Sequence, residues 1–242
     1  MRFAITIACI AVLAGCASAP SWPDPQPDSG QILVHLDGKA RQGVRTANNR
    51  EIVGEYDSAK ENTERGANFE RVNYGAIEDV VVILHGTRQT SARGPGVRPI
   101  LAVGNMKFSR QQVAMLPGGT LTLRNDRSSA VTVFGASDDE FFELTVEPKT
   151  TGSVTVPRAG VYEVMCEEDE SLSCTLYVTE GICWIGPSSE SAFFIDVEPG
   201  KYTVSVYAPR LPARSFDVTV EAGTRHTATI NLSVNDLPKM KR

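Results

Sequence analysis

The chain has 242 residues and a formal net charge of −5, with 24 Lys and Arg residues against 29 Asp and Glu residues. Because no basic cluster interrupts this acidic balance, the composition argues against nucleic acid as a partner. Once the N-terminal segments are set aside, the remaining length fits one large all-β unit or two small domains.

The first 15 residues have the layout of a secretory signal peptide. Arg2 precedes an apolar run from Phe3 to Leu13, and small residues follow, as is typical of such signals. The run is shorter than the ~20 residues that a membrane-spanning helix needs. Residues 1–15 are therefore expected to direct export from the cytoplasm.

Cys16 closes this signal in the sequence Leu13-Ala14-Gly15-Cys16, which resembles the lipobox of bacterial lipoproteins. The resemblance implies that Cys16 is lipidated and becomes the first residue of the mature chain; the alternative is an ordinary secretory peptide. Each buried lipid CH₂ contributes ~0.8 kcal/mol, so two or three acyl chains would hold the protein on a membrane. Because no aspartate follows Cys16, we expect a lipid anchor in the outer membrane that faces the periplasm.

Residues 16–30 are predicted to form a tether, because prolines at positions 20, 23, 25 and 27 forbid a helix and favour extended chain. Residues 31–99 are interpreted as an N-terminal β segment that pairs with a C-terminal sandwich. Within it, residues 38–76 are charged and turn-rich, with a short helix expected around Ser58 to Arg65. Gly94-Pro95-Gly96 has no phosphate-loop spacing and reads as a turn.

From Asp79 onward, short runs rich in Val, Thr, Tyr and Phe alternate with Gly, Pro and Asn-Asp turn signals. This pattern predicts an all-β protein, with strands that pack one face and expose the other. The strands are expected at 80–85, 100–103, 107–109, 112–115, 120–124, 131–136, 141–146, 151–156, 160–166, 174–179, 192–197, 200–208, 214–221 and 225–232.

The segment from Asn105 to Val178 resembles the cupredoxin family. Asn125-Asp126 matches the turn before the strand with the first copper histidine, Gly160-Val161-Tyr162 matches the closing G-x-Y, and Cys166 matches the copper-ligating cysteine. The resemblance implies a cupredoxin-like Greek-key β-sandwich over residues 100–180.

The resemblance extends from Val80 to Ala208 when plastocyanin-like proteins labelled as methylamine-utilisation proteins are considered. Their last pattern is similar to Phe194–Val206. Residues 181–235 look like a smaller transthyretin-like or carboxypeptidase-regulatory β-sandwich, and residues 236–242 are expected to be a loose tail.

The family's copper ligands fall largely on residues that cannot replace them. The first histidine falls on Val131, the second on Asp169 and the methionine on Leu172, so that only Cys166 remains. A blue-copper site needs two imidazoles and a thiolate. We therefore expect no metal or other cofactor. The alternative is a divergent copper-binding or electron-transfer protein that uses Cys166 with Asp169 or with one of the unaligned histidines His35, His85 and His226.

Cys166 and Cys174 flank four acidic residues in the sequence VMCEEDESLSC. Two predicted strands meet here, so a hairpin could bring the cysteines together, and the envelope is oxidising. We expect a disulfide between Cys166 and Cys174, with Cys183 as an alternative partner for either. A metal on Cys166, Asp169 and Glu167 or Glu168 is the weaker reading, and the acids disfavour a reactive thiolate.

A second acidic group, Asp138-Asp139-Glu140 with Glu143, is expected at the same pole as Cys166, either as a solvated turn or as a docking face for a basic partner or divalent cations. The sequence has no H-E-x-x-H or G-x-S-x-G motif, which disfavours a hydrolase. The expected function is that of a non-catalytic, membrane-anchored envelope lipoprotein that acts as a scaffold or binds a protein partner.

Overall fold

The computed structural model describes residues 22–39, 73–86, 100–104 and 107–233. The expected signal peptide, Cys16, the helix around 58–65, the turn at 94–96 and the tail at 236–242 lie outside these residues. Over the described residues, every regular element is a strand, so the predicted all-β class is confirmed. None of these residues forms a helix long and apolar enough to span a membrane.

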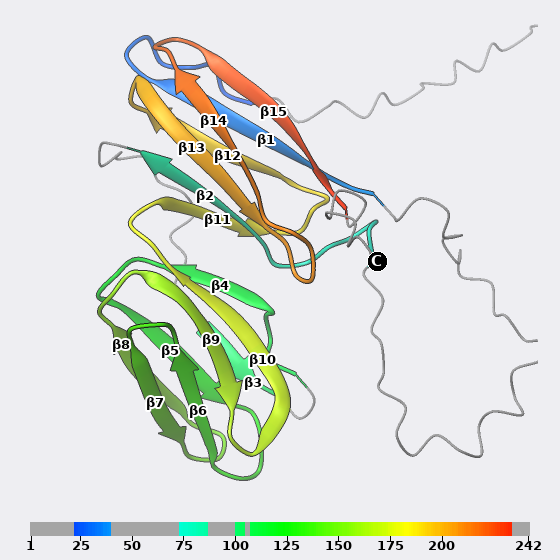
Figure 1. The fold of residues 1–242 in the computed structure, drawn as a ribbon, viewed down its shortest axis with the longest axis vertical. Helices are drawn as coiled ribbons and strands as arrows, with labels where there is room; N and C mark the ends of the chain where they lie inside the picture. The colour runs from blue at the N-terminus through cyan, green and yellow to red at the C-terminus, as the bar shows by residue number, and fades with distance from the viewer. Residues whose placement is uncertain (1–21, 40–72, 87–99, 105–106, 234–242) are drawn as a thin grey trace, which may run out of the picture.

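The first of two β-sandwiches, here called the terminal sandwich, takes strands from both ends of the described chain (Figure 1). One sheet has the order β12-β1-β15 and the other has the order β11-β2-β13-β14. The strands are β1 (Gly30–Gly38), β2 (Val80–Gly86), β11 (Ile182–Gly186), β12 (Ser191–Val197), β13 (Gly200–Tyr207), β14 (Arg214–Val220) and β15 (Arg225–Leu232).

The second, here called the inserted sandwich, is formed entirely by the chain between β2 and β11. A sheet of order β4-β10-β9-β6-β7 packs against a sheet of order β3-β5-β8. The strands are β3 (Ile100–Val103), β4 (Gln112–Met115), β5 (Gly119–Asn125), β6 (Val131–Ala136), β7 (Phe141–Val146), β8 (Thr151–Val156), β9 (Gly160–Cys166) and β10 (Asp169–Val178).

Each sandwich has its own hydrophobic core, as alternating strands require. Ile32, Phe194 and Val204 are at most 1% exposed within the terminal sandwich. Leu121 and Leu176 are fully buried within the inserted one.

A third apolar cluster joins the two sandwiches. Val81 and Ile83 point from the outer face of β2 toward Ala114 on β4 and Tyr177 on β10. The Tyr177 ring also packs on Tyr207, with 4.5 Å between ring centroids. Strand β2 is thus buried on both faces, which explains why its sequence VVVIL is continuously apolar rather than alternating.

Each sandwich has one buried tyrosine whose hydroxyl donates to a backbone carbonyl four residues earlier. The hydroxyl of Tyr162 donates to the carbonyl of Arg158 at 3.0 Å, and the hydroxyl of Tyr202 donates to the carbonyl of Glu198 at 2.8 Å. Both tyrosines are buried at the start of a strand, two residues after a glycine. Each hydroxyl therefore fixes the turn that leads into its own strand, as in a tyrosine corner.

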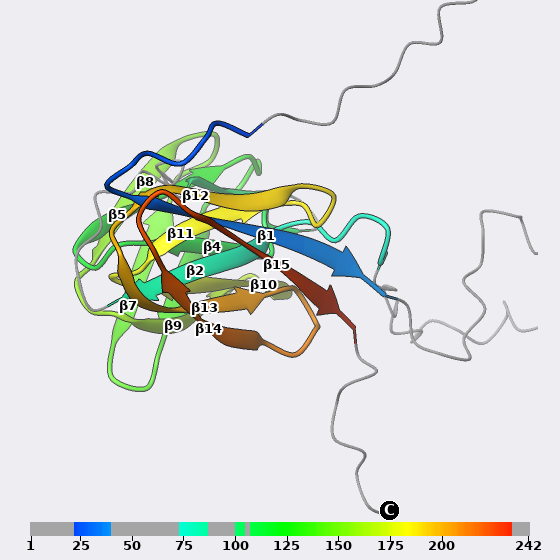
Figure 2. The ribbon, with the colours of Figure 1, turned by 90° about the horizontal axis from the view of Figure 1, so that it is seen from above.

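The second half of the predicted tether, residues 22–29, lies on the terminal sandwich (Figure 2). The Trp22 ring packs on Phe193, with 4.7 Å between ring centroids. The Arg225 guanidinium lies over the same Phe193 ring and donates to the carbonyl of Pro23. The same carbonyl accepts a hydrogen bond from the side-chain amide of Gln31. This part of the chain is therefore docked rather than a free spacer.

Two strand predictions need correction, and one strand was missed. Residues 107–109 form only an isolated bridge between Phe108 and Val103, because the Ser109 hydroxyl accepts the Ala102 N–H that a strand partner would use. Strand β10 begins at Asp169 rather than at Cys174, and β11 was not predicted at all.

Candidate functional site

The Cys166 pole is where the hairpin between β9 and β10 meets the start of β6. The Cys166 thiol donates to Oε2 of Glu168, with 3.1 Å between sulfur and oxygen. Both carboxylate oxygens of Glu168 also accept the Thr132 N–H, at 2.9 and 3.0 Å. Glu168 therefore ties the hairpin to β6 at the end where β9 stops.

The other positions aligned with copper ligands are engaged in packing or local bonding. Val131 and Leu172 are 0% and 1% exposed and belong to the core of the inserted sandwich. The carboxylate of Asp169 accepts hydrogen bonds from the backbone and hydroxyl of Ser171, at 3.2 and 2.6 Å. Two of the three positions thus offer no donor atom, and the third is held by its own turn.

All three histidines lie on the terminal sandwich. The Nδ1 atom of His35 on β1 shares a hydrogen bond with the Ser191 hydroxyl at 2.7 Å. His85 is on β2 and His226 is on β15. Over the described ranges, no three His, Cys, Asp or Glu side chains are grouped closely enough to hold a metal ion. The residues at the Cys166 pole therefore do not fit a blue-copper ion, which needs imidazole nitrogens beside the thiolate.

The electrostatics of the pole favour a protonated thiol. Burial, and then the hydrogen bond to Glu168, raises the pKa of Cys166. Burial alone would raise the pKa of Glu168, but hydrogen bonds from Cys166 and the backbone outweigh it and lower that pKa. A neutral thiol beside a carboxylate is a poor nucleophile and a poor metal ligand.

The expected disulfide between Cys166 and Cys174 is not present in the structure, where both cysteines are buried free thiols. Cys183, the alternative partner, is a half-buried free thiol. The register gives the reason: Cys174 lies opposite Val164, two residues before Cys166. Such diagonal neighbours are about 7–8 Å apart, beyond the ~4.4–6.8 Å Cα separation of a disulfide. Burial raises the pKa of Cys174 and of Cys183 to about 12.

The acidic turn at 138–140 does not lie at the Cys166 pole, contrary to expectation. The register of β6 on β9 places Val133 opposite Cys166 and Ala136 opposite Glu163. The turn therefore follows the far end of β6, where Glu140 forms a 2.8 Å ion pair with Arg158. The turn is thus separated from the Cys166 pole along the length of the sheet, whereas Glu143 lies opposite Phe134, one residue from the level of Cys166.

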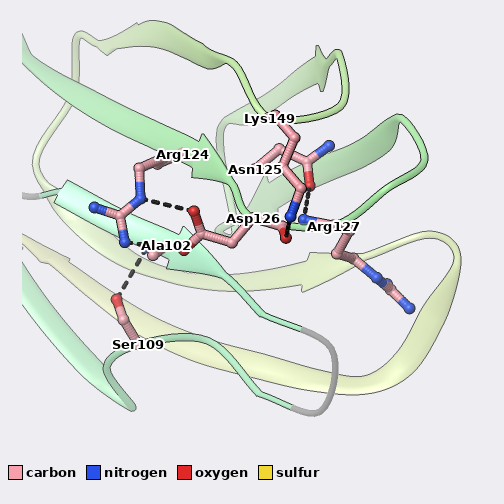
Figure 3. Close-up of polar contacts among 7 residues, drawn as sticks. All are labelled: Ala102, Ser109, Arg124, Asn125, Asp126, Arg127 and Lys149. Carbon is pink, nitrogen blue, oxygen red and sulfur yellow. Dashed lines mark hydrogen bonds and ion pairs between the residues drawn. The ribbon is translucent and has the colours of Figure 1, made fainter.

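Asn125 was interpreted from the sequence only as part of a turn, but at the end of β5 it has a structural role. Asn125 is 0% exposed, and its amide nitrogen donates to the carbonyls of Ser129, Val146 and Glu147 at 2.8, 3.0 and 3.2 Å. Its amide oxygen accepts the Arg127 N–H at 2.8 Å (Figure 3). This side chain shapes the loop that leads into β6 and hence to Thr132.

Exposed charges surround Asn125. Arg124 forms two hydrogen bonds with the Asp126 carboxylate, at 3.0 and 2.9 Å, and Lys149 donates to the Asp126 carbonyl (Figure 3). The hydrogen bond from Arg124 lowers the pKa of Asp126. These contacts are solvent-exposed, so the buried amide rather than the ion pair is expected to hold the loop.

Comparison with known proteins finds distant similarities to solved structures. No family model matches the chain, and no curated protein matches it. An oxidised amicyanin mutant is 14% identical and is matched over 40% of this chain and 99% of its own, with a TM-score of 0.31. Amicyanin from Paracoccus versutus is 15% identical over 40% of this chain and 97% of its own, again with a TM-score of 0.31.

Proposed function

We propose that this protein is a non-catalytic, lipid-anchored protein of the bacterial cell envelope that acts as a scaffold or partner-binding module, and that its cupredoxin-like part has lost copper binding. The observation that carries the proposal is the Cys166 thiol bonded to Glu168, with buried Val131 and Leu172 where copper ligands would stand.

The chemistry of the donor set supports the loss of copper. The pole supplies one protonated thiol and carboxylates, whereas copper that cycles between two oxidation states is held by imidazole and thiolate. Each sandwich has its own core of buried apolar side chains. A β-sandwich can lose a site in this way because its stability resides in the core rather than in the site.

The anchor part of the proposal rests on Cys16 and the small residues before it. The docked segment adds a geometric consequence. Six residue steps separate Cys16 from Trp22, and extended chain spans at most ~3.6 Å per residue. If Cys16 is lipidated, the docked Trp22 lies within roughly 20 Å of the anchor, which keeps the terminal sandwich close to the bilayer.

Mass spectrometry and cell fractionation of the full chain, produced in a Gram-negative bacterium, test the anchor. The mature protein is expected to begin at Cys16, to carry the mass of acyl chains and to sediment with outer membranes. The matched variant Cys16→Ser should be recovered without lipid mass. An unmodified protein cleaved at another site and recovered free in the periplasm would overturn this part of the proposal.

A further inference from the structure

Residues 22–29, here called the strap, lie on the outer face of the sheet β12-β1-β15. Ala192 and Phe194 on β12 are core residues, so Phe193 between them points outward. The Trp22 ring packs on Phe193, with 4.7 Å between ring centroids. The Arg225 guanidinium on β15 lies 5.8 Å from the centroid of the same Phe193 ring. This face of the sheet therefore supplies an aromatic ring and a cation to hold the N-terminal end of the strap.

Hydrogen bonds fix the strap backbone to the same face. Nε of Arg225 donates to Oε1 of Gln31 at 2.8 Å, and a second nitrogen of Arg225 donates to the carbonyls of Trp22 and Pro23. The Gln31 side-chain amide donates to the Pro23 carbonyl at 3.1 Å, and Gln31 is only 4% exposed. Phe193, Gln31 and Arg225 belong to β12, β1 and β15. All three strands of the sheet therefore contribute to holding the strap.

The inserted sandwich contacts the terminal sandwich on the opposite side. Val81 and Ile83 on β2 belong to the sheet β11-β2-β13-β14, and they form the junction with Ala114 and Tyr177. In Figure 1, β1 and β15 lie at the top, β2 and β11 lie below them, and the inserted sandwich lies at the bottom. The strap and the inserted sandwich are therefore on opposite faces of the terminal sandwich.

The Cys166 pole lies at the end of the inserted sandwich away from this junction. Tyr177 at the junction lies opposite Val161 in the register of β10 on β9. Cys166 is at the other end of β9, five residue steps farther on, which corresponds to roughly 17 Å along a strand. Figure 1 shows the hairpin between β9 and β10 at the end of the molecule away from β1 and β15. The order along the molecule is therefore strap, terminal sandwich, junction and Cys166 pole.

We propose that the strap orients the anchored protein, so that the outer face of the sheet β12-β1-β15 faces the lipid bilayer and the Cys166 pole is presented away from it. The inference rests on the proposed lipid anchor at Cys16, and it names the end of the molecule that stays accessible to a partner. With the strap docked, Cys16 lies within roughly 20 Å of Trp22, whereas a released strap would allow roughly 50 Å between Cys16 and Gly30. The strap contacts therefore set both the orientation and the reach of the anchored protein.

Energy transfer from the protein to acceptor lipids measures this orientation. The mature lipidated chain is placed on vesicles of phosphatidylethanolamine and phosphatidylglycerol that carry an acceptor dye on their headgroups. A donor dye is attached at Thr227→Cys on β15 or at Glu170→Cys beside the Cys166 pole, both of which are exposed positions. We expect transfer from position 227 to be at least about twofold more efficient, because sheet spacings of ~10 Å and roughly 17 Å of strand separate the two levels.

The native thiols leave this labelling selective for the added cysteine. Burial raises the pKa of Cys174 and of Cys183 to about 12, and burial also raises the pKa of Cys166. These thiols stay protonated at neutral pH and react slowly, because the thiolate is the nucleophile. The lipidated chain without an added cysteine is the blank for dye uptake.

Phe193→Ser tests whether the strap causes the orientation. It removes the ring that contacts both Trp22 and Arg225. Transfer from position 227 should fall at least about twofold, because the released strap increases the reach from roughly 20 to roughly 50 Å. Phe141→Ser is the matched control, since Phe141 is 60% exposed on the inserted sandwich, and it should leave transfer unchanged. Circular dichroism and thermal melts would verify that each variant folds.

Acrylamide quenching tests the docking of the strap without a membrane. The chain has two tryptophans, Trp22 and Trp184. In the mature Cys16→Ser chain, the difference between the parent and its Trp22→Phe variant isolates the fluorescence of Trp22. Trp22 is expected to be shielded in the parent and to be quenched as readily as a free tryptophan after Phe193→Ser.

Equal transfer from positions 227 and 170, or transfer and quenching that do not respond to Phe193→Ser, would overturn the inference. A mature chain without lipid mass at Cys16 would overturn the proposed anchor and this orientation with it, and mass spectrometry reports that result separately. A lipidated chain with equal transfer from both positions would leave the anchor standing and remove the orientation alone.

Discussion

Each of the two sandwiches has a tyrosine corner, but the side chains at their ends differ in chemistry. Tyr202 and Tyr162 make equivalent hydrogen bonds to a carbonyl four residues earlier. Yet the histidines lie on the terminal sandwich, while Cys166 and Glu168 close one end of the inserted one. The tyrosine hydrogen bond and the apolar core therefore recur in both sandwiches, while the side chains at their ends differ.

The loop after β5 in the inserted sandwich is a second difference, because the buried side-chain amide of Asn125 holds it. The largest effect is therefore expected for Asn125→Ala, which leaves three carbonyls and one N–H without their partner. We expect the free energy of unfolding to fall by about 2–4 kcal/mol. Urea denaturation followed by circular dichroism measures this change.

Asp126→Ala is the matched control for that experiment. It removes an exposed ion pair with Arg124 next to the same loop, so it should change stability by less than about 0.5 kcal/mol. If Asp126→Ala lowered the free energy of unfolding as much as Asn125→Ala does, the loop would depend on the surface charges rather than on the buried amide.

Because both sandwiches have a tyrosine corner, loss of its hydroxyl is expected to lower the free energy of unfolding equally in each. Tyr162→Phe and Tyr202→Phe each remove one hydroxyl donor and keep the buried ring. Each should lower the free energy of unfolding by about 1 kcal/mol. Differential scanning calorimetry would compare them, and a large loss in only one variant would show that the corners are not equivalent.

A smaller, pH-dependent effect is expected at the Cys166 pole. The pKa of Glu168 is lowered in the folded protein from its ordinary value of 4.5. Its hydrogen bonds therefore contribute stability above that value, and the contribution is lost as the pH falls through the lowered pKa. Glu168→Gln should cost less than about 1 kcal/mol at pH 7, because the group is exposed, and nothing in strong acid.

The same substitution should lower the pKa of Cys166, because it removes the carboxylate that helps to raise it. Thiol alkylation rates measured against pH report this shift, with Cys166→Ser as the blank. An unchanged or higher Cys166 pKa would mean that the bond between thiol and carboxylate does not control this end of the sandwich.

The strands of the inserted sandwich were largely predictable because their side chains alternate. Strand β6 reads Val131 to Ala136 with every second residue buried, and its predicted bounds are those observed. Strand β11 was missed because its five residues ICWIG show no such contrast: Trp184 packs in one core and Cys183 faces the junction. The parallel pairing of β1 with β15 depends on residues far apart in the chain, which no local pattern reveals.

The local bonding of the site could not be predicted from the sequence. Comparison with the family pattern placed Val131, Asp169 and Leu172 at ligand positions. The role of Glu168 depends on the turn that returns its carboxylate to Thr132. The expected disulfide assumed that β10 begins at Cys174, whereas it begins at Asp169 and pairs Cys174 with Val164.

Titration of the purified mature chain with Cu²⁺, followed by visible absorption and equilibrium dialysis, tests the central claim most directly. The account predicts a colourless protein without stoichiometric binding at the Cys166 pole, and identical curves for the wild type and for Cys166→Ser. An intense blue band from thiolate to copper, present in the wild type and in Cys174→Ser but abolished in Cys166→Ser, would contradict it.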